Sequence, residues 1–551
     1  MKGIYLVVNS ILIVLSVAAL SNCDEGEWRK VHIAQGDVLG RKDPAGGLYT
    51  FYNIPYATVP TGTDRFKAPL PGPVWVQSLE AVDKGIICMQ VPTKGITSLT
   101  MQEDCLIANI FVPDTDEKDL PVIVSIHGGG FEIGYGAMVS PKYLVKTKKV
   151  IVVTFNYRLG VQGFLCLGTN DVPGNAGLKD QVALLRWVQK NIASFGGNPN
   201  DVTLTGGSAG SISTLLLMLS KSAEGLFKKV VPQSGAAVAS VAVQLDPLEN
   251  AKMWAKMLNF TNVDDLTALE DFYKNTPLES LYFSALREDS SLFHSPCIEA
   301  HTSEETVLDD SPYDIIKSGN YRKVPILIGT TNMEGLIQVN KLQMWEMAMN
   351  ENFSDFLPAD LQFDKEEQKE EIAKKVKEFY FGDQPVGEDT ILSYVEYFSD
   401  VMFNFPTLRT VQLLVESGHD QIYLYQYSFV DESTPYVPFT KVRGAGHCAQ
   451  SVAIFDGVPS VTDDESKLSV EYQQMKATMR RILHNFAVHG KPVLNGSSLP
   501  AWPVADADGS PYMSLTEPVQ LEGAYLEKRA KFWNDIYEKY YREPVPPQLQ
   551  L

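Results

Sequence analysis

The sequence predicts an α/β fold in which a mostly parallel central sheet is covered by helices on both faces. Apolar runs recur at residues 121–126, 150–155, 202–205 and 324–328, and stretches typical of helices lie between them. Parallel strands that are buried on both faces form such continuous runs, and crossover helices connect them. Two of the runs end directly in glycine-rich turns, which is where sheets of this kind carry functional side chains.

The first of these turns is His127-Gly128-Gly129-Gly130-Phe131. Because glycines have no side chain, this segment can turn its backbone N–H groups inward. Amides that converge in this way stabilise the negative oxygen that forms during acyl transfer. We therefore expect Gly129 and Gly130 to be oxyanion donors.

The second turn has the pattern G-x-S-x-G, with Ser208 between Gly206 and Gly210. A strained strand–turn–helix presents a serine hydroxyl clear of the backbone, and the glycines let the strand and the helix approach each other. Segment 211–219 is the expected helix, whose N-terminal dipole and the N–H of Ala209 would face the serine. Each motif alone is weak evidence. Their order, and a separation of about 80 residues, favour a nucleophilic serine in an α/β-hydrolase fold.

The general base is expected further along the chain, because α/β-hydrolases place the acid and then the histidine after the serine. His447 lies in the glycine-flanked turn Arg443-Gly-Ala-Gly-His-Cys448, shortly after the alternating segment 421–430. A loop beyond a strand's carboxyl end lets a base reach the nucleophile. His419 follows Ser417-Gly418 at a predicted helix end, where a cation near the last carbonyls is the ordinary interpretation. His447 is therefore the predicted base.

The acid is harder to identify, because the chain has 67 acidic residues. The run at 324–328 predicts a buried strand, and Glu334 lies just past its carboxyl end, next to Gly335. A carboxylate there can accept the imidazole N–H, hold the tautomer and stabilise the imidazolium. Position favours Glu334, and context alone leaves other carboxylates open.

Long and specific motifs also occur outside these turns. They are Phe51-Tyr-Asn-Ile-Pro-Tyr-Ala57, Asp64-Arg-Phe-Lys-Ala-Pro69, Glu103-Asp-Cys-Leu106, Asn156-Tyr-Arg-Leu-Gly160, Asn175-Ala-Gly-Leu-Lys-Asp-Gln181, Leu185-Arg-Trp-Val188 and Asn191-Ile-Ala-Ser-Phe-Gly-Gly-Asn-Pro199. With them the chain resembles the type-B carboxylesterases (the carboxylesterase/cholinesterase family), and most of all the secreted insect esterases. The resemblance extends over nearly the whole mature chain.

The resemblance implies a set of site residues: Ser208 as nucleophile, Glu334 as acid, His447 as base, and Gly129, Gly130 and Ala209 as oxyanion donors. It also implies a disulfide between Cys88 and Cys105. A loop of this size is worth ~3 kcal/mol in the chain-entropy model, which is disputed.

Two positions depart from the family pattern. Most relatives carry Glu before the nucleophile and juvenile-hormone esterases usually carry Gln, whereas this chain has Gly207, which weakens an assignment as a juvenile-hormone esterase. Relatives often follow the histidine with acidic residues and Leu, where this chain has Cys448-Ala-Gln-Ser451. Cholinesterase-type relatives hold a quaternary ammonium with that Glu and a Trp of the first disulfide loop. Segment 89–104 has no aromatic residue, so we expect a preference for uncharged esters.

The domain organisation is expected to be simple. Residues 1–23 have the basic start, apolar core and small residues of a signal peptide. Residues 24–551 are expected to form a single carboxylesterase domain, since the site residues must converge. The C-terminal tail has neither a retention signal nor a hydrophobic GPI tail, so secretion to the extracellular space is predicted. Three sequons are candidate glycosylation sites: Asn259, Asn352 and Asn495.

Composition excludes several functions. A net charge of −20, with no basic cluster, disfavours binding to nucleic acid or to an anionic membrane surface. No pair of cysteines has metal-ligand spacing, so no metal site is expected, and acyl transfer by a serine needs no cofactor. The remaining cysteines Cys166, Cys297 and Cys448 are expected to be small buried apolar groups, with Cys448 a candidate for the pocket edge.

The predicted function is that of a secreted serine carboxylesterase, which hydrolyses small, uncharged, apolar carboxylic esters through an acyl-enzyme intermediate and has no membrane anchor. One alternative is a slow-turnover esterase that sequesters its ligand or degrades a hormone or pheromone. A less favoured alternative is a non-catalytic adhesion protein of the same fold, which would typically lack a triad residue and carry a transmembrane stalk. Juvenile hormone, an ester pheromone or odorant, a dietary ester and a xenobiotic all stay open as substrates.

Overall fold

The computed structural model describes residues 27–548 except 83–84, 93–98, 284–286, 290, 301, 303–304 and 457–463. The predicted signal peptide, with Cys23, lies outside the described residues.

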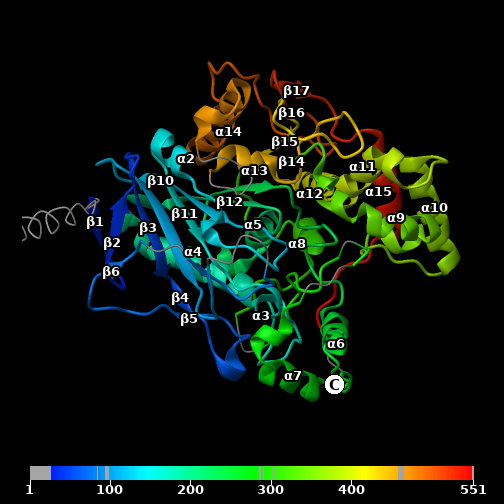
Figure 1. Cartoon of the computed structure of the whole chain (residues 1–551), viewed down its shortest axis with the longest axis horizontal. Helices are drawn as coiled ribbons and strands as arrows, with labels where there is room; N and C mark the ends of the chain where they lie inside the picture. The colour runs from blue at the N-terminus through cyan, green and yellow to red at the C-terminus, as the bar shows by residue number, and fades with distance from the viewer. Residues whose placement is uncertain are drawn as a thin grey trace, which may run out of the picture.

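The described residues form one 13-stranded sheet, in the order β1-β2-β3-β9-β11-β10-β12-β13-β14-β15-β16-β17, with β6 beside β2 (Figure 1). Its strands are β1 (Trp28–Ile33), β2 (Gly36–Lys42), β3 (Leu48–Pro55), β6 (Leu79–Glu80), β9 (Ile107–Pro113), β10 (Leu120–Ile126), β11 (Ile151–Phe155), β12 (Gly197–Gly207), β13 (Lys229–Gln233), β14 (Ile326–Thr331), β15 (Ile422–Tyr427), β16 (Tyr512–Leu515) and β17 (Gln520–Glu522). The pairs from β11 through β16 are all parallel. The other pairs along this order are antiparallel, and β6 pairs with β2 in parallel. Two small sheets pair β4 (Ala57–Thr58) with β5 (Leu70–Pro71) and β7 (Ile86–Ile87) with β8 (Thr100–Met101).

Each predicted apolar run lies in a central strand. The runs at 121–126, 150–155, 202–205 and 324–328 coincide with β10, β11, β12 and the start of β14. Because these strands are parallel neighbours, their carboxyl ends meet at one edge of the sheet. The chain leaves that edge at Ile126, Gly207 and Thr331, so the three turns expected to carry chemistry are brought together there.

Helices cover both faces of the sheet. One face packs against α4 (Ala176–Asn191), α5 (Ala209–Leu219) and α12 (Phe405–Glu416), and the other against α2 (Lys142–Lys148), α13 (Ala449–Ile454) and α14 (Val470–His489). The side chains of β10 alternate between the two faces of the sheet. Val122 and Val124 pack in the core on the side of α4, α5 and α12, whereas Ile123 packs in the core on the side of α2, α13 and α14. The predicted fold class, an α/β fold with a covered, mostly parallel sheet, is confirmed.

The remaining helices lie outside these two layers. They are α3 (Gly160–Phe164), α6 (Pro247–Met257), α7 (Leu266–Asn275), α8 (Pro312–Ser318), α9 (Leu342–Glu351), α10 (Glu366–Phe381), α11 (Ile391–Ser399) and α15 (Lys528–Tyr540). Figure 1 shows α9, α10, α11 and α15 together at the right of the view. Nε1 of Trp533 in α15 donates a 2.7 Å hydrogen bond to the hydroxyl of Tyr380 in α10, which ties the last helix to this group. In the described residues, no helix has both the length and the apolar character needed to span a bilayer.

Two disulfides close loops in the described part of the chain. Cys88 and Cys105 are bonded, as the resemblance implied. Cys166 and Cys297 are also bonded, so the prediction that they are unpaired apolar groups is wrong. They are 131 residues apart in sequence, and only the folded chain brings them together. Asn175 supports this bond, since its side chain exchanges hydrogen bonds of 2.8 and 2.9 Å with the backbone of Cys297.

Candidate active site

Ser208 occupies the sharp turn between β12 and α5. Its φ of 57° and ψ of −125° are strained for a residue with a side chain, and its N–H is held by the carbonyl of Gln233 at 2.9 Å. The glycines are needed for close approach: a Cβ on Gly206 would lie 2.3 Å from the carbonyl oxygen of Gly210, and a Cβ on Gly210 would lie 2.1 Å from that of Ile126. The predicted elbow therefore has the expected geometry.

Glu334 and His447 meet beside this turn. Nδ1 of His447 lies 2.5 Å from Oε2 of Glu334, and Glu334 is 0% exposed. The other carboxylate oxygen, Oε1, accepts hydrogen bonds from the N–H of Thr331, at 2.7 Å, and from the hydroxyl of Ser234. Nε2 of Gln450 donates to that hydroxyl at 2.6 Å. Both oxygens of the carboxylate are thus occupied, and its orientation is fixed.

The environment of His447 favours its protonated form. Burial alone would lower the pKa of His447, but the charges of Cys448 and Glu334 beside the ring raise the pKa above its ordinary value. The ring also packs against Phe403, with 4.4 Å between the ring centroids. Phe403 lies in a π-helical turn, Asp400–Asn404, a distortion frequently found at functional sites.

The free nitrogen of His447 has an unexpected neighbour. Nε2 lies 3.6 Å from Sγ of Cys448. In the described part of the chain, the hydroxyl of Ser208 makes no hydrogen bond. The structure therefore brings Ser208, His447 and Glu334 to one site, where Nε2 of His447 is hydrogen-bonded to the thiol.

The glycine loop lies directly opposite the serine. A Cβ on Gly128 would lie 3.0 Å from Cβ of Ser208, so the two turns are in contact. Gly129 and Gly130 have φ of 113° and 63°, and among the described residues neither donates a backbone hydrogen bond. Ala209 is the first residue of α5, where an N–H has no partner within the helix. All three amides are thus available for a bound oxygen.

Gln90 braces the glycine loop at Gly134, where the segment that follows the turn 127–131 continues, and sequence reasoning did not identify it. Its side chain accepts from the N–H of Gly134 at 2.9 Å and donates to the carbonyl of the same residue at 3.0 Å. It also donates to the carbonyl of Cys88 at 3.1 Å. The first disulfide loop is thereby joined to the glycine loop, a link between distant segments that carries no sequence signal.

A pocket of about 430 Å³ opens onto these groups, a size that suits a small organic ligand. Its lining residues are Ser125, Ile126, His127, Gly128, Gly129, Gly130, Phe131, Ile133, Met138, Val139, Gly206, Gly207, Ser208, Ala209, Ile212, Gln233, Val241, Leu292, Ile337, Met402, Phe403, His447, Cys448, Ser451, Val452 and Phe455. None of these described residues is Asp, Glu, Lys or Arg. Burial lowers the pKa of His127 to about 4, so that side chain is neutral at physiological pH. The pocket therefore suits an uncharged, apolar ligand.

Gly207 leaves space that two neighbours fill. A Cβ at this position would lie 3.0 Å from Oγ of Ser451 and 3.2 Å from Sγ of Cys448. Ser451 donates a 2.5 Å hydrogen bond to Oε1 of Gln233. Cys448 lines the pocket, as predicted for a residue at the pocket edge. The space beside Gly207 is thus occupied by a thiol and a hydroxyl.

His419 differs from its prediction. It is 3% exposed, and burial lowers its pKa to about 4. The prediction that His419 is a cation at a helix end is therefore wrong. Its neutral ring packs inside the protein, where the charged form would lose its hydration.

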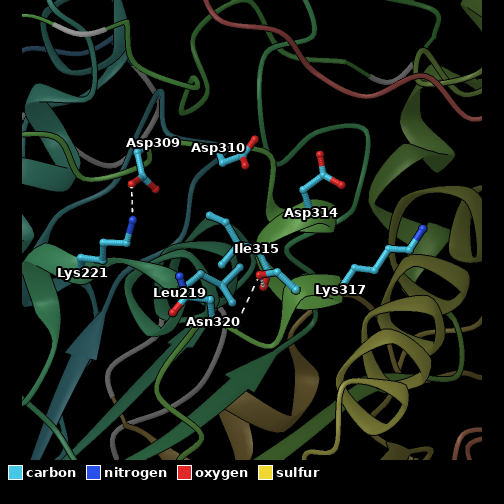
Figure 2. Close-up of a pocket in the computed structure, with 9 residues that line it drawn as sticks. Leu219, Lys221, Asp309, Asp310, Asp314, Ile315, Lys317 and Asn320 are labelled. Atoms are coloured by element: carbon cyan, nitrogen blue, oxygen red, sulfur yellow. Dashed lines mark hydrogen bonds and ion pairs between the residues drawn. The ribbon is translucent and has the colours of Figure 1, made fainter.

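A second hollow, of about 480 Å³, lies near the far end of α5, about 16 Å of helix away from Ser208. It is lined by Leu219, Lys221, Asp309, Asp310, Asp314, Ile315, Lys317, Ser318 and Asn320. Figure 2 shows Lys221 pointing to Asp309, with 2.6 Å between the charged atoms. Both side chains are solvent-exposed, so this hollow has the character of a hydrated surface and not of an ester site.

Comparison with known proteins agrees with this geometry. The sequence profile described as "Carboxylesterase family" matches residues 27–533. The chain is 32% identical over 537 residues to a juvenile hormone esterase from Heliothis virescens, which covers 92% of this chain and 93% of the relative. It is 30% identical over 512 residues to Esterase FE4 from Myzus persicae, covering 88% of each chain.

Solved structures give the same result. The crystal structure of juvenile hormone esterase from Manduca sexta, with OTFP covalently attached, matches with a TM-score of 0.81 at 31% identity and covers 93% of this chain and 100% of that one. A PNB esterase structure matches with a TM-score of 0.72 at 27% identity, covering 92% and 99% of the two chains. The expected α/β-hydrolase fold is confirmed.

Proposed function

The chain belongs to the carboxylesterase family, and from this premise we propose that it hydrolyses small, uncharged esters through an acyl-enzyme formed on Ser208. Hydrolysis of carboxylic esters by a serine carboxylesterase is the activity of the family. The residues that carry it, the preference for uncharged substrates and the secretion of the protein are our proposals.

In the proposed mechanism, Oγ of Ser208 attacks the ester carbonyl while Nε2 of His447 takes its proton. Glu334 holds the imidazole by Nδ1 and stabilises the imidazolium. The carbonyl oxygen becomes negative and accepts hydrogen bonds from the glycine-loop amides and Ala209. The imidazolium then protonates the leaving alcohol, and a water molecule repeats the sequence to release the acid.

One observation carries this proposal. A glycine-flanked serine on a strained turn, a histidine held by a fixed carboxylate and a set of unpaired amides all lie at one pocket, whose described lining contains no Asp, Glu, Lys or Arg. Acyl transfer requires these groups together.

The direct test is a pair of substitutions and their combination. Ser208→Ala and His447→Ala should each lower kcat for p-nitrophenyl butyrate by roughly 10⁴-fold or more while the melting temperature stays within a few degrees. The double variant should cost little more than either, because the two residues act as a unit. Additive losses would show that they act independently and would contradict the assignment.

The substrate is proposed only as a class. Two of the relatives are named as juvenile hormone esterases, and Gly207 departs from the residue usual in that group. A panel of juvenile hormone and neutral esters of graded acyl and alcohol size, compared by kcat/KM, distinguishes juvenile hormone, pheromone, dietary and xenobiotic substrates. The contact of Nε2 with Cys448 favours a second candidate, a slow-turnover esterase that holds its ligand. A pre-steady-state burst with slow deacylation would support it.

We also propose that the mature protein, residues 24–551, is one secreted, glycosylated carboxylesterase domain. The asparagines of all three sequons, Asn259, Asn352 and Asn495, are exposed and therefore accessible to modification. Mass measurement of the secreted protein before and after glycosidase treatment, with N-terminal sequencing, tests both the cleavage after residue 23 and the glycan sites.

A further inference from the structure

We propose that the thiol of Cys448 competes with Ser208 for Nε2 of His447 and so holds the enzyme in a slow state. This inference deepens the proposed function and rests on it. Sγ lies 3.6 Å from Nε2, within hydrogen-bonding distance for sulfur. In the described residues, the Ser208 hydroxyl has no hydrogen bond of its own. Cys448 is not part of a disulfide, so its sulfur keeps this capacity.

The position of the thiol depends on the glycine before the nucleophile. A Cβ on Gly207 would lie only 3.2 Å from Sγ of Cys448, which is tighter than ordinary van der Waals contact. Cys448 itself has a φ of 62° and a ψ of 18° and stands at the start of α13. Its side chain makes no capping hydrogen bond to that helix. The thiol therefore contacts the histidine and does not cap the helix.

The contact blocks the base in either protonation state. With a neutral pair, S–H donates to the lone pair of Nε2 that must accept the serine proton. With an ion pair, Nε2 already carries the proton and donates it toward the thiolate. In neither state can Nε2 accept a proton from Ser208 until the contact opens, so the fraction of enzyme with a free base limits acylation.

The charged and titratable surroundings of His447 predict the pH dependence. Glu334 faces Nδ1 and Cys448 faces Nε2, and together they raise the pKa of His447. Tyr425, in the neighbouring strand β15, stays neutral because burial raises its pKa far above the physiological range. Because Cys448 is one of the two neighbours that raise the pKa of His447, removing its side chain should lower that pKa. Since the base acts only when deprotonated, the acidic limb of kcat/KM should then move to lower pH.

The test uses Cys448→Ala and Cys448→Ser. The alanine variant keeps the Cβ and therefore the same unfavourable positive φ at position 448. A difference in kcat between the alanine variant and the natural chain therefore reports the loss of the sulfur alone. We expect kcat for p-nitrophenyl butyrate, per phosphonate-titrated site, to rise about 2- to 10-fold in the alanine variant, the rate equivalent of one net hydrogen bond. KM should change little. Serine keeps a donor at this position and should give a kcat between those of alanine and the natural chain.

The outcomes separate this inference from the proposed function. An unchanged or lower kcat in Cys448→Ala, or an acidic limb that does not move, would overturn the competition. If the alanine variant does not fold, Cys448→Gly replaces it, because the positive φ at position 448 suits glycine. The same kcat and the same pH profile are then measured. Adding Ser208→Ala to each variant measures any hydrolysis that does not depend on Ser208. If that change leaves the hydrolysis intact, the proposed function is wrong. If it abolishes hydrolysis while Cys448→Ala has no effect, only the competition is wrong.

Discussion

Nδ1 of His447 lies 2.5 Å from Oε2 of Glu334, although 113 residues of sequence separate the two side chains. The second oxygen of the carboxylate is occupied by Thr331 and Ser234. Because the carboxylate cannot rotate freely, it accepts a hydrogen bond from Nδ1–H of His447, and Nε2 is left toward the pocket. The tautomer of His447, the proposed base, is therefore set by the partner of its other nitrogen.

Glu334→Gln should test whether that charge is needed. The amide has nearly the same shape, so the fold should persist. It cannot stabilise an imidazolium, and its NH₂ group favours the wrong tautomer, so kcat should fall by up to about 10⁴-fold. Glu334→Asp keeps the charge but places it farther from His447, so its kcat should fall much less than that of Glu334→Gln. The measurement is kcat with the melting temperature of each variant, and a fully active Gln variant would remove Glu334 from the site.

Gly129→Ala should disrupt the loop opposite Ser208. The added Cβ would lie 2.0 Å from the carbonyl oxygen of Ile133, at a φ of 113°, so the loop must shift. Loss of one oxyanion donor typically costs ~10²–10³ in rate. Gly130→Ala is the matched control, because its Cβ would meet only Leu292, at 3.9 Å. We expect a large loss of kcat for Gly129→Ala, a smaller one for Gly130→Ala, and phosphonate labelling of both. A kcat for Gly129→Ala that is unchanged from the natural chain would contradict this loop as the oxyanion site.

The pocket should discriminate against cationic esters. Its lining has no carboxylate among the described residues, and Gly207, directly before Ser208, adds no charge. Segment 89–104 offers no aromatic ring, and a cation–π contact is worth about 0.5–2 kcal/mol. We expect kcat/KM for 3,3-dimethylbutyl butyrate to exceed that for butyrylcholine by roughly tenfold or more. A ratio near one, or one that favours the cation, would reveal a cation site elsewhere in the pocket.

The Cys166–Cys297 disulfide should contribute substantially to stability. It joins residues 131 positions apart, and in the chain-entropy model a loop of about this length is worth about 4–5 kcal/mol. The double variant Cys166→Ala, Cys297→Ala should lose about 2–5 kcal/mol of unfolding free energy, measured by urea denaturation. The matched control is the Cys88→Ala, Cys105→Ala pair, whose sequence separation is 17 and whose loss should be smaller. An unaltered denaturation midpoint in the first variant would show that the bond adds no stability.

The sequence predicted the parts of the molecule whose information is local. Apolar runs predicted the central strands, because parallel strands bury both faces. The turns at Ser208 and at the glycine loop were found because glycine is needed where backbones approach within van der Waals distance. His447 and Glu334 were predicted as base and acid because each follows a strand, although position alone could not separate Glu334 from other carboxylates without the family resemblance.

The parts that the sequence did not reveal depend on contacts between distant segments. The pairing of Cys166 with Cys297 has no local signal, and each cysteine alone looks like a small apolar residue. His419 was interpreted from its place at a helix end, whereas its burial is decided by tertiary packing. Gln90 and Phe403 support the site from segments with no recognisable motif. The contact of Cys448 with His447 requires atomic positions, since neighbours in sequence need not touch through their side chains.

The most direct test of the central claim is covalent labelling of Ser208. Purified protein is treated with a fluorophosphonate, and the intact mass and the modified peptide are determined, with Ser208→Ala as the control. The account predicts one phosphonate per chain, located on Ser208, with no label on the alanine variant. Failure of the folded protein to react, or a label on a different residue, would contradict Ser208 as the nucleophile.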